Sequence, residues 1–208
     1  MVKRNLHEYP SVALRSEDLN GPIDFAQLFG RRAPVHIEIG TGKGTFILHE
    51  ARARPEADFI GIEWSRPFYL FAVDRIGRWG LTNVRITHTD ATVFLSRYVP
   101  PESVDVLHIY FPDPWPKKSH HKKRMLQPYN MRFLIQCLKP GGEMRIATDH
   151  AEYFEQMERV IDLFRDVLEP VEFTRPAGAR EGELVGTNFE RKYIPDKRTI
   201  RTLALRKK

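Results

Sequence analysis

Three acidic side chains, Glu38, Glu63 and Asp90, stand at the ends of three successive apolar segments of this chain. A carboxylate in the position of Glu63 can accept hydrogen bonds from both hydroxyls of a ribose, as in dinucleotide-binding proteins. A carboxylate in the position of Asp90 can accept a hydrogen bond from an adenine amino group. Each acid could instead cap a helix, which for Asp90 alone is the better interpretation. Together the three acids indicate a pocket for an adenosyl group that carries positive charge rather than phosphates.

A glycine-rich turn, Gly40-Thr41-Gly42-Lys43-Gly44, begins two residues after Glu38. Glycine permits a tight turn and lets a ligand approach the backbone, and the N-terminus of a following helix offers free N–H groups. The spacing is G-x-G-x-G, and Thr45 stands where the dinucleotide fingerprint has its third glycine. A plain turn explains the glycines alone, and a dinucleotide oxidoreductase is a distant alternative. With the acids, the turn favours S-adenosylmethionine, because its sulfonium and ammonium groups suit carboxylates.

A proline-rich loop with a strongly basic end follows the fourth apolar segment, and its sequence is Phe111-Pro-Asp-Pro-Trp-Pro-Lys-Lys118. The alternating prolines restrict the backbone and hold Asp113 and Trp115 stiffly. The run from Lys117 to Arg124 carries five formal positive charges and no acid. Aromatic side chains stack on bases and basic side chains neutralise phosphates, so the loop indicates a site for a nucleobase on a phosphate backbone. The alternative is a rigid loop with a hydrophobic lid and a solvated basic surface.

Repeated alternation of strand and helix must position these residues. The expected strands are 35–39, 59–63, 84–88, 104–111, 143–148 and 199–205, and the expected helices are 45–54, 68–79, a short one after Asp90, 129–138 and about 150–168. This pattern predicts an α/β fold with a doubly wound, mostly parallel Rossmann-like sheet and helices on both faces. We expect an N-terminal arm over residues 1–33, with a short helix near 25–29, and a single domain over residues 34–208. In such a sheet ligands bind at the carboxyl ends of the strands, where the acids and the two loops lie.

The composition is that of an ordinary soluble protein with a mild basic bias. The 208 residues include 41% hydrophobic and 29% charged side chains, with a formal net charge of +6. No apolar run approaches the roughly 18 residues of a membrane span, and the first residues contain no apolar signal core. The single cysteine, Cys137, excludes disulfides within the chain, and His120 and His121 lack the partners of a zinc site. We therefore expect a reduced, cytoplasmic protein with no metal, no membrane association and no obligate protein partner.

The proline-rich loop and the basic run resemble the signature of bacterial tRNA (guanine-N7)-methyltransferases. The motif Glu38-Ile-Gly-x-Gly-x-Gly, Thr148-Asp149 and Thr187-Asn188-Phe189-Glu190 follow in the order that this family shows. The resemblance covers residues 34–205, and its most specific part is 111–124. One departure is Arg191-Lys192-Tyr193, where many members have a glycine. The resemblance implies a methyltransferase fold, S-adenosylmethionine as cofactor and tRNA as partner, with a guanine of the variable loop as target.

The resemblance also implies roles for the matching positions. The residues that would contact or border the cofactor are Glu38, Gly40, Gly42, Glu63, Asp90 and Asp113, of which Asp113 would also be the active-site residue. The residues that would contact the substrate guanosine are Lys117, Asp149, Thr187, Asn188, Phe189 and Glu190. The residues that would contact tRNA are Ser119, His120, His121, Lys122, Lys123 and Arg124.

The expected chemistry is a direct displacement by guanine N7, which has a free lone pair and carries no proton at neutral pH. We therefore expect Asp113 to orient the reactants and to stabilise developing charge, without abstracting a proton. Two other enzymes remain open, a methyltransferase for another RNA and one for a small molecule, although the latter leaves the basic run unexplained. A non-catalytic RNA-binding protein with a vestigial pocket is also open, although it predicts loss of the strand-end acids.

Overall fold

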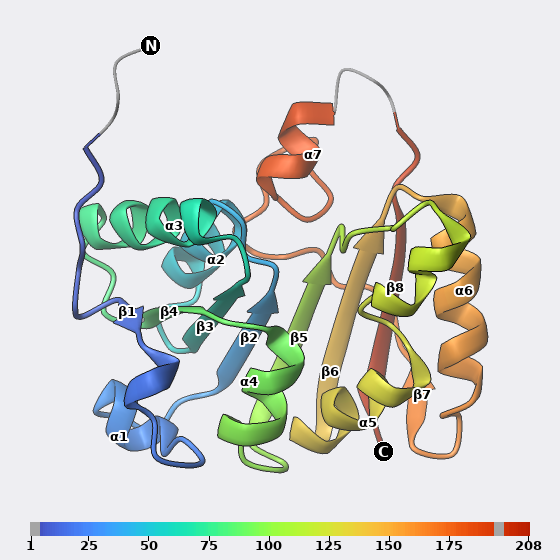
Figure 1. The fold of residues 1–208 in the computed structure, drawn as a ribbon, viewed down its shortest axis with the longest axis horizontal. Helices are drawn as coiled ribbons and strands as arrows, with labels where there is room; N and C mark the ends of the chain where they lie inside the picture. The colour runs from blue at the N-terminus through green and yellow to red at the C-terminus, as the bar shows by residue number, and fades with distance from the viewer. Residues whose placement is uncertain (1–4, 194–197) are drawn as a thin grey trace.

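The computed structural model describes residues 5–193 and 198–208, and these form a single eight-stranded sheet covered by helices on both faces (Figure 1). The strand order is β1-β4-β3-β2-β5-β6-β8-β7. Strands β1 to β6 run parallel to one another, whereas β8 runs antiparallel to both β6 and β7. The order reverses at β2, so the loops after β2 and β5 lie on either side of a crevice where open sheets of this kind bind ligands.

The strands are β1 (Ala13–Leu14), β2 (Val35–Ile39), β3 (Asp58–Glu63), β4 (Val84–His88), β5 (Val104–Tyr110), β6 (Leu138–Thr148), β7 (Leu168–Pro170) and β8 (Arg201–Lys207). The helices are α1 (Phe25–Phe29), α2 (Thr45–Ala53), α3 (Arg66–Arg78), α4 (Ala91–Tyr98), α5 (Pro128–Cys137), α6 (Ala151–Asp162) and α7 (Asn188–Tyr193), with 3-10 turns η1 (Ser16–Asp18) and η2 (Lys118–Lys123). The predicted doubly wound, mostly parallel α/β fold is therefore confirmed.

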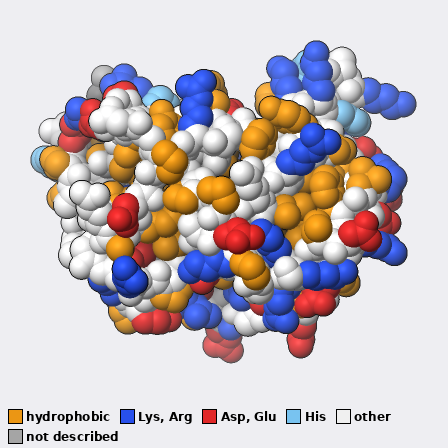
Figure 2. All heavy atoms as spheres, turned by 90° about the horizontal axis from the view of Figure 1, so that it is seen from below, with side chains coloured by type: hydrophobic (Ala, Val, Ile, Leu, Met, Phe, Trp, Pro, Cys, Tyr) orange, Lys and Arg blue, Asp and Glu red, His pale blue; other side chains and the backbone are white. Residues whose placement is uncertain are grey.

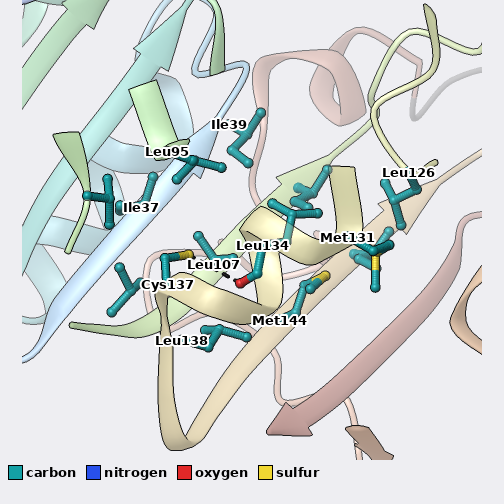
Figure 3. Packing of buried hydrophobic residues seen from close by; sticks show 14 of the residues in the cluster. Ile37, Ile39, Leu95, Leu107, Leu126, Met131, Leu134, Cys137, Leu138 and Met144 are labelled. Atoms are coloured by element: carbon teal, nitrogen blue, oxygen red, sulfur yellow. Dashed lines mark hydrogen bonds between the residues drawn. The ribbon is translucent and has the colours of Figure 1, made fainter. Parts of the chain in front are cut away.

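Two hydrophobic clusters join the helices to the two faces of the sheet. Helices α2 and α3 pack on one face, whereas α1, α4, α5 and α6 pack on the other. Figure 3 shows α5 above the central strands, where Met131 and Leu134 lie against Leu107 of β5 and Met144 of β6. Because both faces are covered, the central strands are buried along nearly their whole length, which is why they appear in the sequence as short, mostly hydrophobic runs. The side of the molecule away from the carboxyl ends mixes hydrophobic, acidic and basic side chains (Figure 2).

The expected secondary structure is correct for the central elements and wrong at the end of the long helix expected after residue 150. The helix expected to reach residue 168 ends at Asp162, and Leu168 begins the edge strand β7 instead. Leu168 is buried and pairs with Lys207 of β8, so pairing with a segment 39 residues away overrides the local helical pattern. The sequence also gave no indication of β1 or of α7.

The N-terminal segment packs against the edge of the sheet. Ala13 and Leu14 pair with β4, and the ring of Tyr9 lies so close to Gly77 of α3 that any side chain there would overlap it. The expected short helix is present as α1, which Asp24 caps by accepting a hydrogen bond from the Gln27 amide. The division of the chain at residue 33 into an arm and a domain stays a prediction.

Candidate active site

A cavity of about 480 Å³ opens at the carboxyl ends of β2, β3 and β5. Four of the sequence-predicted cofactor residues, Glu38, Gly40, Gly42 and Glu63, line this cavity together with Asp113. The further lining residues are Ile39, Thr41, Lys43, Thr45, Phe46, Trp64, Ser65, Phe68, Tyr110, Phe111, Pro112, Thr187, Asn188, Phe189, Lys192 and Tyr193. The volume falls in the range of about 300–1,000 Å³ that small-molecule and cofactor sites occupy.

Glu38 is a buried carboxyl group at the base of the cavity. Its side chain accepts a hydrogen bond from the Thr41 hydroxyl. Burial raises the pKa of Glu38 to about 8, with the nearby charge of Glu63 acting in the same direction and the Thr41 hydrogen bond opposing both. A raised pKa means that the surroundings disfavour the carboxylate, so a positively charged ligand would relieve an unfavourable condition here.

Glu63 is held by the backbone on both sides of the cavity entrance. One carboxylate oxygen accepts a hydrogen bond from the Gly42 amide and the other from the Ser65 amide, each at 2.7 Å. The glycine turn makes the first contact possible, since Gly40, Gly42 and Gly44 all have positive φ angles, of 78°, 56° and 69°. Each oxygen keeps a further lone pair, so the fixed carboxylate can still accept two hydroxyl groups.

Asp90 lies outside the residues that line the cavity. It caps α4, because its Oδ1 atom accepts hydrogen bonds from the amides of Thr92 and Val93 at 2.8 Å and 3.1 Å. The capping interpretation considered for Asp90 therefore describes this structure, and contact with a cofactor stays a prediction.

The loop that carries Asp113 is strained on both sides of that residue. Phe111 and Trp115 have positive φ angles of 51° and 43°, which non-glycine residues rarely adopt and which cost of order 1–3 kcal/mol each. Asp113 itself is exposed at the cavity. Such backbone angles persist only where surrounding contacts hold the loop in place. The same contacts therefore keep Asp113 beside the acidic cavity.

A second cavity of about 340 Å³ adjoins the first and shares Phe111, Phe189 and Tyr193 with it. The Phe111 and Phe189 rings stack with centroids 4.6 Å apart. Asp149 lines this cavity and accepts a hydrogen bond from the Arg198 guanidinium at 2.6 Å, while that guanidinium also lies 4.0 Å from the centre of the Tyr193 ring. Aromatic surfaces beside a carboxylate suit a flat ring system that carries hydrogen-bond donors.

The Thr187–Glu190 motif folds as a capped turn that begins α7. The Thr187 hydroxyl accepts a hydrogen bond from the Glu190 amide. The Glu190 carboxylate, only 2% exposed, accepts from the amides of Leu184, Val185 and Gly186. Glu190 also lines the second cavity, and its Oε1 atom accepts only one of these three bonds, so contact with a substrate stays a prediction. The S/T-x-x-E spacing of a capping motif was the signal that could have indicated the capped turn.

The three residues after this motif, 191–193, are those that differ from the glycine found in many family members. Arg191 forms an ion pair with Glu183, and Lys192 and Tyr193 line the first cavity. Asn188 lines the first cavity, whereas Phe189 lines both cavities.

The basic run forms the 3-10 turn η2 beside the Asp113 loop. Lys117, Lys118, Ser119, Lys122 and Lys123 are exposed, whereas His120 and His121 are partly buried. The Lys123 ammonium lies 4.8 Å from the centre of the Trp115 ring, so the aromatic side chain of the loop packs against the basic turn. Within the described residues, no three His, Cys, Asp or Glu side chains are placed to hold a metal ion, and no helix is long and apolar enough to cross a membrane.

Arg124 is the exception in the basic run, because it is 0% exposed. Its guanidinium bonds to Glu152 and Gln156 of α6 and to the Pro114 carbonyl. The expectation that Arg124 contacts tRNA is not supported by this arrangement, because internal acceptors surround its charge. Sequence reasoning missed this because a run of basic residues does not reveal which side chain turns inward.

Two aromatic residues of the cavity were also missed. Trp64 follows Glu63 directly and is 73% exposed, and Phe68 lies one turn further along in α3. The signal that could have indicated them was two large aromatic side chains within five residues of the strand-end acid Glu63.

The fold is that of Rossmann-like methyltransferases. The aminoglycoside resistance methyltransferase NpmB1 has a TM-score of 0.57 at 19% identity, covering 84% of this chain and 87% of its own. A 30S ribosomal A1408 methyltransferase from an uncultured bacterium has a TM-score of 0.60 at 15% identity, covering 89% and 93%. At these identities the likeness concerns the fold alone.

The sequence comparisons identify a particular family within this class. The model of a family described as "Putative methyltransferase" matches residues 32–202. The tRNA (guanine-N(7)-)-methyltransferase of Alkalilimnicola ehrlichii is 37% identical over 200 residues, which span 96% of this chain and 84% of that protein. The enzyme of the same name from Nitrosococcus oceani is 45% identical over 141 residues, but the match spans only 60% of its length. The chain belongs to the tRNA (guanine-N7)-methyltransferase family, which confirms the resemblance found in the sequence.

Proposed function

We propose that this protein transfers a methyl group from S-adenosylmethionine to N7 of a guanine in tRNA and forms 7-methylguanosine. The observation that carries the proposal is the place of Asp113, which borders an acid-lined cavity and precedes an exposed basic turn in one rigid loop. The family supports the same reaction, since the relatives named above carry this activity in their names.

The residues of the larger cavity fit S-adenosylmethionine. The cofactor supplies a methyl group bonded to a positively charged sulfur. Glu38 lines the cavity, and its ionised carboxylate would attract a cationic ligand, which would in turn lower the raised pKa of about 8. Glu63, fixed by two backbone amides, is proposed to accept the ribose hydroxyls, and Gly40 and Gly42 let the ligand approach the backbone. Asp90 is proposed to border this ligand from the start of α4.

The second cavity is proposed to hold the guanosine. A guanine ring offers an N–H and an amino group on one edge, and the Asp149 carboxylate can accept from both. The Phe111, Phe189 and Tyr193 rings provide apolar surface for the base. Thr187 and Asn188, which line the first cavity, and Lys117 of the Asp113 loop are proposed to contact the guanosine as well. Glu190 contributes by holding the 184–186 backbone in place.

The chain is proposed to act by positioning and charge. Guanine N7 needs no base, because its lone pair is free, whereas the product purine is cationic. Asp113 is therefore proposed to hold the base in line with the methyl group and to stabilise the charge that develops on the ring. N7 of a paired guanine faces the deep, narrow major groove of an RNA helix, which side chains cannot reach, so the target base is proposed to be exposed or flipped into the cavity.

The tRNA backbone is proposed to bind along η2, through Ser119, His120, His121, Lys122 and Lys123. The exposed cations favour a polyanionic substrate over a small molecule, which would leave them without a role. We further propose that the target guanine lies in the variable loop and that the enzyme works in the cytoplasm, where its substrate is.

The test is to incubate the protein with labelled S-adenosylmethionine and unmodified tRNA, digest the RNA and identify the labelled nucleoside. We expect 7-methylguanosine from wild-type protein and little from Asp113→Ala. A control tRNA with its variable-loop guanine replaced by adenine should take up no label. Label in another nucleoside, or none with any tRNA, would exclude the proposed reaction.

A further inference from the structure

The most completely bonded side chain near the proposed site is Arg124, although nothing in the reaction itself uses it. A guanidinium has five N–H groups, and here four of them donate to oxygen atoms while the fifth faces a ring nitrogen of His121. The Nε atom donates to the Pro114 carbonyl at 2.7 Å. One terminal nitrogen donates to Glu152 Oε1 at 3.1 Å and to the Gln156 side-chain oxygen. The other donates to Glu152 Oε2 at 2.5 Å and lies 3.0 Å from His121 Nε2.

These acceptors come from three different parts of the proposed site. Pro114 follows Asp113 in the strained loop, His121 belongs to the basic turn η2, and Glu152 lies in the first turn of α6. Helix α6 begins two residues after Asp149 of the second cavity. The guanidinium also lies over the buried Tyr153 ring, 4.6 Å from its centre. One side chain thus links the methyl-transfer loop, the tRNA-binding turn and the base cavity.

We propose that Arg124 is a positioning residue for methyl transfer, which fixes the Asp113 loop and η2 against α6 and does not bind tRNA. The proposal rests on the proposed function for the reaction it affects, but the contacts themselves do not. Phe111 and Trp115 keep their unfavourable φ angles only while surrounding contacts hold the loop, and the bond to the Pro114 carbonyl lies between Asp113 and Trp115. Without it, the loop can relax and Asp113 loses its place beside the cavity.

The geometry also explains why an arginine is needed at this position. The planar guanidinium spreads its five donors over three nitrogen atoms and so reaches acceptors on three sides. A lysine ammonium carries its three donors on a single nitrogen atom and cannot span the same acceptors. Because the Glu152 side chain is 49% exposed, its charge stays solvated when Arg124 is replaced, so we expect the fold to survive the change. The loss should therefore appear in catalysis more than in folding.

The first measurement is single-turnover methylation at saturating tRNA and S-adenosylmethionine, together with the salt dependence of tRNA binding. For Arg124→Met we expect at least a tenfold slower rate with an unchanged log–log salt slope, and Arg124→Lys should recover only part of the rate. A phosphate contact would instead lower the slope by about 0.7–0.9 and leave the saturated rate intact, which would overturn the proposal. Arg159→Met is the matched control, because Arg159 makes an exposed ion pair with Glu155 on the same helix, and it should change neither quantity.

The second measurement needs no methylation. Trypsin should cut the 117–123 segment of Arg124→Met faster than that of wild type, while Arg159→Met should match wild type. If wild-type protein methylates no tRNA, the proposed function fails, yet this cleavage still tests the role of Arg124. Wild-type cleavage and a wild-type rate in Arg124→Met would overturn the inference alone.

A third variant covers the case in which Arg124→Met does not fold. Glu152→Gln removes one charged acceptor and keeps the guanidinium. We expect at least a threefold slower rate and an unchanged salt slope, and an unaltered rate would count against the proposal.

Discussion

The raised pKa of the buried Glu38 carboxyl leads to a quantitative prediction about proton release on cofactor binding. Its pKa in the folded protein is about 8, against 4.5 for an ordinary glutamate, mainly because burial disfavours the charged form. At pH 7 about nine-tenths of the molecules would therefore carry a proton on Glu38 by simple titration. If the cationic cofactor binds only to the ionised form, binding must release that proton.

The affinity for S-adenosylmethionine should then rise with pH by up to tenfold per unit between about pH 5 and pH 8, and level off above. Calorimetry in buffers of different ionisation enthalpy should give about 0.9 protons released per ligand at pH 7. Glu38→Gln should remove both effects. 5′-Methylthioadenosine, which lacks the sulfonium and the ammonium, is the matched control ligand and should show neither.

The Glu38 carboxyl also determines how the free energy of unfolding changes with pH. Because the folded pKa of Glu38 is raised above its unfolded value, its contribution to stability is full below pH 4.5 and is lost as pH rises to about 8. The difference in pKa corresponds to an upper bound of ~5 kcal/mol in the free energy of unfolding. The ligand-free protein should lose stability over this range, and Glu38→Gln should lose less. An affinity for S-adenosylmethionine that does not change with pH, together with no proton release, would refute the assignment of a raised pKa to Glu38.

Further variants test the other parts of the site. Asp113→Asn should keep part of the single-turnover rate, and that rate should show no dependence on a base near neutral pH; a steep rise with pH that disappears in the variant, with chemistry rate-limiting, would mean that Asp113 abstracts a proton. Replacing the exposed Lys118 and Lys122 by alanine should lower the salt slope of tRNA binding by about 0.7–0.9 for each lost phosphate contact, as measured by filter binding, and leave cofactor affinity unchanged; an unaltered slope would return this turn to ordinary solvated surface. Glu190→Gln should destabilise the protein by ~2–3 kcal/mol in denaturant unfolding, because charge-assisted bonds to three amides are lost, whereas a substrate-binding role alone would leave stability unchanged.

The sequence alone determined the fold class and the place of the larger cavity. Short apolar runs alternating with helical segments have one common solution, a parallel sheet covered on both faces, and its carboxyl ends must lie along one edge. Glu38, Glu63 and Asp113 therefore had to meet there, and they do. These conclusions needed only local patterns and the rules of sheet topology.

The tertiary structure decided which side chains of each motif face the site. Arg124 and Lys123 are adjacent and equally basic, yet one is buried among the acceptors of α6 and the other is exposed on Trp115. Glu190 accepts hydrogen bonds from three backbone amides, a structural role that its motif alone did not reveal. Leu168 continued a helical pattern but joins β8 as a strand. In each case the deciding partner lies on a different element or in a folded loop, and burial and hydrogen bonding with that partner outweigh what neighbouring residues prefer.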